Sequence, residues 1–104
     1  MTLAFPDLDD TKRLLDGVRD SVRMDIILML GKSQSMNVTD IAGEFRISRP
    51  AISHHLKVLK DAGIVTSEKI GQEVYYRLNA ARLIGALRQI ADIIENCCPP
   101  DKPA

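Results

Sequence analysis

Residues 48–60 carry a series of hydrogen-bond donors and cations whose spacing suits contact with DNA. Arg49, Ser53 and Lys57 recur at i, i+4 and i+8, which places them on one side of a helix. An arginine there reaches a guanine edge or a phosphate, and later lysines meet phosphates. The alternative is an ordinary solvated helix face. The candidate DNA contacts in this segment are Ser48, Arg49, Ser53, His54, Lys57 and Lys60.

The apolar residues between these side chains predict the helix that would carry them. Ser48 is a suitable N-cap, and Gly63 marks the end. The inward face comprises Ile52, Leu56, Leu59 and Ala62. A shorter helix is predicted to begin at the cap Asn37 and to end near Phe45. Two short helices joined by a tight turn make a helix-turn-helix.

A β-hairpin is predicted directly after this pair of helices. Its strands run over Ile64–Ile70 and Val74–Leu78, with Gly71–Glu73 as the turn. Lys69 and Gln72 lie at the hairpin tip, where they would either touch DNA or simply form a solvated turn. The hairpin gives the helix-turn-helix a wing.

Three further helices complete the predicted fold, which is mainly α with one β-hairpin in the order α-α-α-α-β-β-α. They cover Asp9–Val18, a segment from the cap Asp20 to Gly31, and a segment from the cap Asn79 to about Cys97. Met24, Leu28 and Met29 widen the apolar face of the second, so we expect it to be buried on most sides. The last helix has an apolar stripe of Leu83, Ile84, Leu87, Ile90, Ala91 and Ile94. Such a stripe needs two partners, its own core and a twin, which predicts a homodimer; the alternative is a last helix that lies wholly on its own domain.

The length and charge of the chain limit the classes of protein to which it can belong. The 104 residues suffice for one domain, expected over 1–98, with 99–104 as a disordered tail. The net charge is zero, but residues 46–69 carry 5 basic and 2 acidic side chains, a balance of +3. The longest apolar run, Ile26 to Leu30, is too short to span a membrane, and the first residues do not form a secretion signal. We expect a cytoplasmic protein with no membrane association.

The segment from Val38 to Val65 resembles the helix-turn-helix of the ArsR/SmtB repressors, most specifically in its Ser-His-His-Leu-Lys-Val-Leu core followed by Ala-Gly. Residues 71–78 look like the second wing strand of that family, and residues 18–27 like its second helix. The resemblance implies a winged helix that forms a homodimer through its first and last helices and binds a palindromic operator on double-stranded DNA. It also implies release by an inducer, usually a metal ion, a metalloid or an oxidant.

The sequence departs from the best-known members at the positions where they bind metals. Asn37, Val38, Thr39 and Asp40 stand where many members have a Cys-Val-Cys-Asp box, so no thiolate is present there. Other members use carboxylates and histidines along the last helix. The matching positions are Ala80, Arg82, Ile93 and Asn96. A zinc, nickel or cadmium sensor of either design is therefore not expected, and no cofactor is required.

Cys97 and Cys98 remain as candidate inducer ligands. Trivalent arsenic or antimony is soft and binds two or three thiolates, and some arsenic-responsive members carry paired cysteines just past the last helix. A third cysteine is missing here. One hypothesis is therefore a site for trivalent arsenic or antimony, and a second is a disulfide to the other subunit on oxidation. The third is a pair of passive thiols.

Two other function classes, an enzyme and a protein-contact module, fit the sequence less well than a repressor. An enzyme is disfavoured because Ser53-His54 and Cys97-Cys98 lack an orienting third group, and the sequence has no phosphate loop or paired carboxylates. His54 and His55 would not bind one ion without other ligands, since neighbours on a helix point about 100° apart. We expect His54 to face DNA and His55 to pack or form a hydrogen bond beside the core. A winged helix used only for protein contacts is disfavoured by the cationic face at 49–60.

Overall fold

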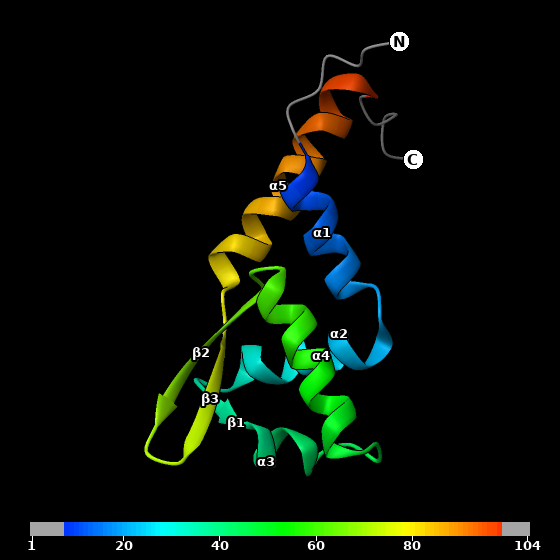
Figure 1. Cartoon of the computed structure of the whole chain (residues 1–104). Coiled ribbons are helices and arrows are strands. Elements are labelled where there is room, and N and C mark those ends of the chain that lie inside the picture. Colours follow the sequence, from blue (N-terminus) through cyan, green and yellow to red (C-terminus); the bar gives the residue numbers. More distant parts are fainter. Residues whose placement is uncertain (1–7, 99–104) are drawn as a thin grey trace.

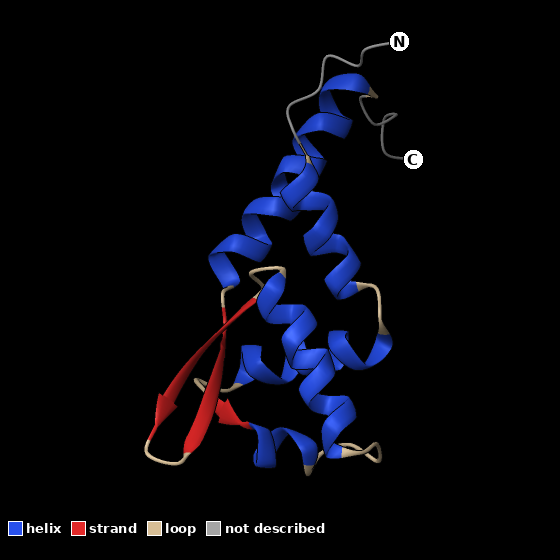
Figure 2. Ribbon diagram, in the orientation of Figure 1, coloured by secondary structure: helices blue, strands red, loops and turns tan. Residues whose placement is uncertain are grey.

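The computed structural model describes residues 8–98, so the tail predicted at 99–104 lies outside the described residues. Five helices and a small sheet follow one another in the predicted order, with one short strand added (Figures 1 and 2). They are α1 (Asp9–Val18), α2 (Ser21–Lys32), β1 (Met36–Asn37), α3 (Val38–Ala42), α4 (Arg49–Asp61), β2 (Val65–Ile70), β3 (Glu73–Leu78) and α5 (Ala80–Cys97). Helices α1 and α5 lie side by side at one end of the molecule, and α3, α4 and the hairpin form the other.

The hairpin is tighter than the sequence suggested. Ile70 pairs with Glu73, so the turn contains two residues, Gly71 and Gln72, and not three. Gly71 has a φ of +62°, whereas Gln72 has a negative φ. This combination fits a type II′ turn, which matches the twist of the two strands and favours glycine first.

Strand β1 was not predicted. It contains only Met36 and Asn37, which pair antiparallel with Tyr76 and Tyr75 of β3, giving the sheet order β1-β3-β2. A two-residue strand is too short to produce an alternating pattern in the sequence. Its effect is to connect the start of α3 to the middle of β3.

Side-chain caps begin four of the helices, α2 to α5, at the residues that the sequence indicated, with Ser48 capping α4. The Asp20 carboxylate accepts a hydrogen bond from the Arg23 N–H at 3.1 Å. Asn37 accepts one from the Asp40 N–H at 2.7 Å. The Asn79 side chain likewise caps α5. Each cap satisfies an N–H that the first helical turn leaves unpaired.

The core lies where α4 meets the other helices and the base of the sheet. Ile52, Leu56 and Leu59 of α4 are all 0% exposed, which confirms the predicted inward face. Their buried apolar neighbours come from α1, α2, α3 and residues 62–65, which lead from the end of α4 into β2. These are Leu14, Ile26, Ile27, Leu30, Ile41, Ala62, Ile64 and Val65.

Helix α2 is less buried than expected. Ile26, Ile27 and Leu30 face the core, but Met24 is 39% and Leu28 is 57% exposed. The prediction that this helix is buried on most sides is therefore wrong for this chain. The core is only large enough to cover one face of α2, and α2 lies at the surface of the molecule.

Helix α5 rests on the rest of the chain through a narrow contact. None of its residues is buried, and Ile84, Leu87 and Ile94 are each about half exposed. Leu83 and Ala86 pack against the core, and the Thr11 hydroxyl donates to the Gln89 side-chain oxygen at 2.6 Å. No helix within residues 8–98 is long and apolar enough to cross a membrane.

Replacing either of the two glycines with positive φ should destabilise the fold, and by different amounts. Gly63 has a φ of +79°, and a Cβ there would overlap the Arg82 side chain; Gly71 has the same type of backbone but no neighbour within 4 Å. We expect Gly71→Ala to destabilise the fold by about 1 kcal/mol, from backbone strain alone, and Gly63→Ala to cost more. Urea unfolding of both variants measures the difference. Equal losses would contradict a stabilising contact of the Arg82 side chain with the end of α4.

Candidate nucleic-acid interface

The outer face of α4 is formed by the side chains that the sequence singled out. Burial of Ile52, Leu56 and Leu59 leaves only the opposite side of the helix accessible. All six candidate residues on this segment are exposed, and we call this set of residues the α4 face. Its members are Ser48, Arg49, Ser53, His54, Lys57 and Lys60.

The beginning of α4 is fixed by its own sequence. The Ser48 hydroxyl oxygen accepts a hydrogen bond from the Ala51 N–H at 3.2 Å, and Pro50 occupies the first turn. Proline is tolerated there because the N–H it lacks has no partner within the helix. Arg49 is consequently held at the first turn of α4 and is exposed.

An ion pair lies on the α4 face. The Lys57 ammonium is 2.9 Å from the Asp61 carboxylate, one helical turn later. The hydrogen bond to Asp61 and the charge of that carboxylate raise the pKa of Lys57. The i, i+4 spacing of the two residues could have shown this pair in advance. Arg49 and Lys60 have no ion-pair partner within the described part of the chain, so they are the free cations of the face.

The two histidines of α4 have different surroundings, as expected for neighbours on a helix. His54 is exposed, whereas His55 is half-buried with its Nδ1 atom 3.3 Å from Nη1 of Arg23. A guanidinium can only donate, so Arg23 is the donor in this contact. The sequence did not reveal that Arg23, from α2, contacts α4.

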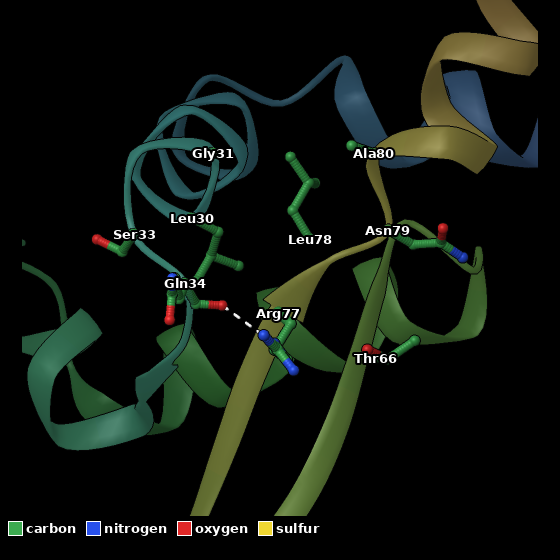
Figure 3. Close-up of a pocket in the computed structure, with 9 residues that line it drawn as sticks. All are labelled: Leu30, Gly31, Ser33, Gln34, Thr66, Arg77, Leu78, Asn79 and Ala80. Atoms are coloured by element: carbon green, nitrogen blue, oxygen red, sulfur yellow. Dashed lines mark hydrogen bonds between the residues drawn. The ribbon is translucent and has the colours of Figure 1, made fainter.

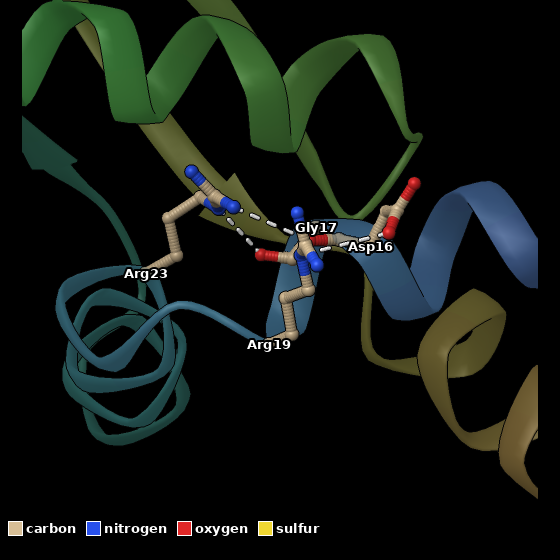
Figure 4. A network of polar contacts seen from close by, with 4 residues as sticks. All are labelled: Asp16, Gly17, Arg19 and Arg23. Carbon is tan, nitrogen blue, oxygen red and sulfur yellow. Dashed lines mark hydrogen bonds and ion pairs between the residues drawn. The ribbon is translucent and has the colours of Figure 1, made fainter.

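Arg23 joins three helices. Its Nε donates to the Gly17 carbonyl at 2.7 Å and its Nη2 to the Asp16 carbonyl at 3.2 Å, both at the end of α1 (Figure 4). Its own backbone N–H donates to Asp20, which lowers the pKa of that carboxyl; the positive guanidinium adds to this, and partial burial opposes it. Arg23 thereby holds the end of α1 against the middle of α4.

The wing presents the remaining two candidate residues. Lys69, on β2, and Gln72, in the turn, are both exposed at the tip of the hairpin. In Figure 1 this tip and the beginning of α4 lie at the same end of the molecule. Helices α1 and α5 lie at the opposite end.

The cysteines are far from the α4 face. Cys97 is the last residue of α5 and Cys98 follows it, and both are exposed. Within residues 8–98, no three His, Cys, Asp or Glu side chains form a group that would hold a metal ion. Of the residues that the resemblance aligned with metal ligands, Asn37 caps α3 and Arg82 donates to the Ala62 carbonyl at 3.4 Å.

A hollow of about 520 Å³ lies between the end of α2, the base of the wing and the beginning of α5 (Figure 3). Its lining includes Arg77, whose Nε donates to the Gln34 carbonyl at 3.2 Å, and Thr66. No His, Cys, Asp or Glu lines it, and neither does any residue of the α4 face. This hollow therefore offers no acid–base pair and is separate from the candidate interface.

The chain is similar to several bacterial repressors. The family described as "Bacterial regulatory protein, arsR family" matches residues 20–67. The transcriptional repressor SdpR of Bacillus subtilis is 38% identical over 74% of this chain and 84% of its own length. The SmtB repressor of Mycobacterium tuberculosis is 42% identical over 68% of this chain, which spans 52% of that protein. The arsenical resistance operon repressor of Staphylococcus aureus is 32% identical over 90% of this chain and 80% of its own length.

A solved structure supports the same assignment. An ArsR-like transcriptional regulator from Rhodococcus sp. RHA1 superposes with a TM-score of 0.73 at 30% identity, covering 81% of this chain and 78% of that one. Both chains have the fold of a winged helix-turn-helix. The chain thus belongs to the ArsR/SmtB family, whose members are transcriptional repressors and not enzymes.

Proposed function

We propose that the chain represses transcription by binding a palindromic operator as a homodimer, with the α4 face entering the major groove of each half-site. The observation that carries this proposal is the division of α4 into a fully buried apolar side and an exposed side of donors and cations. Helix N-terminal residues are well placed to touch base edges in such a helix. Arg49 occupies that position, and Lys60 is placed later, beside the phosphates.

The wing adds contacts at the edge of this interface. Lys69 and Gln72 lie at the hairpin tip, at the same end of the molecule as the beginning of α4. A lysine there neutralises a phosphate, and glutamine can bond to phosphate or to a base edge in the minor groove. Two acidic residues, Glu68 and Glu73, also lie on the wing, so we assign it a supporting role.

The proposed homodimer forms through α1 and α5. Ile84, Leu87 and Ile94 of α5 are 48–55% exposed, and they follow one another along one stripe of the helix. Covering them with a second copy removes apolar surface from water without exposing any buried group. Two-fold symmetry then presents two recognition helices to two half-sites.

DNA binding is tested with duplexes that the wild-type protein selects from a random pool. We expect enriched palindromes, and an affinity that falls steeply with salt as phosphates are neutralised. Arg49→Ala should lower the preference for the selected duplex by about tenfold or more, and Lys60→Ala should reduce the salt slope by about one. Fluorescence anisotropy at several salt concentrations measures both.

Lys32→Ala, which removes an exposed cation from the end of α2, is the control and should bind like wild type. If no duplex is enriched, or if all three variants bind alike, the α4 face is not the interface. In that case the protein-contact alternative becomes the better account of this winged helix.

The dimer is tested by placing a charge on α5. Leu87→Glu should yield a folded monomer, because Leu87 is already 48% exposed in the single chain. Leu28→Glu is the matched control, since Leu28 is 57% exposed on α2, and it should remain dimeric. Sedimentation equilibrium distinguishes the two states. A dimer that survives Leu87→Glu, or one that Leu28→Glu breaks, would move the interface away from α5.

We further propose that trivalent arsenic or antimony releases the repressor from DNA by binding the thiolates of Cys97 and Cys98. Both thiols are exposed at the end of α5, next to the proposed dimer interface. Soft thiolates suit soft metalloids, and a relative is named an arsenical resistance operon repressor. A third thiolate would have to come from the partner subunit, since the chain has only two cysteines.

This inducer is tested by adding arsenite to the protein bound to its selected duplex. Wild type should dissociate, and the Cys97→Ser/Cys98→Ser variant should stay bound. Equal release from both proteins would reject the thiolate site. A parallel sample treated with diamide and run on a non-reducing gel tests the redox alternative: a dimer band, coupled with loss of DNA binding, would favour oxidation over metalloid binding.

A further inference from the structure

The orientation of α5 relative to α4 depends on few contacts. Helix α4 is fixed in the core by three residues with 0% exposure, whereas α5 has no buried residue. Away from its N-terminal cap, the described polar contacts of α5 with other elements are the Thr11–Gln89 hydrogen bond to α1 and the Arg82 contact with the end of α4. Of these two, only the Arg82 contact reaches the recognition helix.

Arg82 lies against the backbone where the chain leaves α4. Its Nε donates to the carbonyl of Ala62, the C-cap of that helix, at 3.4 Å. Gly63 follows with a φ of +79°, and its missing Cβ is what leaves room for the guanidinium. A carbonyl in the last turn of a helix has no partner within the helix, and the helix dipole favours a positive charge there.

We infer that Arg82 is a positioning residue that sets the angle between α5 and α4, and through it the separation of the two recognition helices. This inference rests on the proposed function, because it needs both the α5-mediated dimer and operator binding. With the two α5 helices paired in a dimer, each α4 is placed relative to the dimer axis by its connection to its own α5.

A small change of the angle between α5 and α4 has a large effect on the half-site spacing that the dimer can bind. Helix α4 has 13 residues, so it is about 20 Å long, and a tilt of about 10° about its C-terminal end displaces its beginning by about 3 Å. Arg49 lies at that displaced end. Two half-sites on one side of a duplex are about 34 Å apart, so a shift of this size in both subunits changes which spacing fits.

The alternative is that Arg82 only stabilises the end of α4. A purely stabilising residue would change the unfolding free energy, and any folded variant would bind specific and non-specific DNA as wild type does. A positioning residue instead changes the affinity for correctly spaced half-sites and leaves non-specific binding and its salt slope intact, because the phosphate-binding side chains are unchanged.

The test compares Arg82→Met and Arg82→Lys with Arg88→Met, which removes an exposed cation from the same helix. Binding is measured on the duplex selected by wild type, on a scrambled duplex, and on duplexes with the half-sites moved by one base pair in either direction. Arg82→Lys keeps a positive charge at the end of α4, so it provides a folded variant if Arg82→Met is unstable. Sedimentation confirms that each variant is a dimer.

We expect both Arg82 variants to bind the selected duplex at least fivefold more weakly, with a reduced or shifted preference for half-site spacing. Their affinity for the scrambled duplex should stay within twofold of wild type, and Arg88→Met should match wild type throughout. Unchanged spacing preference in folded, dimeric Arg82 variants would overturn the inference, as would equal losses on both duplexes. Failure of the wild-type protein to prefer any duplex would instead refute the proposed function.

Discussion

Burial of the apolar side of α4 is the constraint on which the rest of the structure depends. Ile52, Leu56 and Leu59 lie at 0% exposure against the other helices, so α4 can only lie with its opposite side in solvent. Rotating the helix about its axis would expose these side chains, at a cost of about 1.5–3 kcal/mol for each. The donors and cations of the α4 face are thus presented outward as a consequence of how the core is packed.

The helix caps and the buried side of α4 could be predicted from the sequence because both depend on residues that are close together along the chain. The caps Asp20, Asn37 and Asn79 each have a short polar side chain placed before an apolar repeat, which is a local signal. The inward face of α4 follows from the 3.6-residue period alone. The positions of the candidate DNA contacts follow in turn, since a side chain midway between core positions must face solvent. Their contact with DNA remains a prediction.

What the sequence did not show depends on contacts between distant residues. Arg23 reaching His55, and Arg82 lying on Gly63, join residues 32 and about 20 positions apart, and no pattern of spacing predicts such pairs. The exposure of Leu28 could not be predicted for a related reason. The apolar pattern of α2 shows which side chains are suited to burial, but the size of the core determines how many of them are buried. Strand β1 was too short to leave a pattern.

The direct test of the account is to map which backbone amides change on binding DNA. Amide NMR spectra of the labelled protein should be recorded with and without its selected duplex. We predict the largest changes at residues 48–60, smaller ones at 69–72, and little change at the exposed apolar residues Met24 and Leu28 of α2. Changes concentrated on α2 or α5, with residues 48–60 unaffected, would contradict the claim that the outer side of α4 meets DNA.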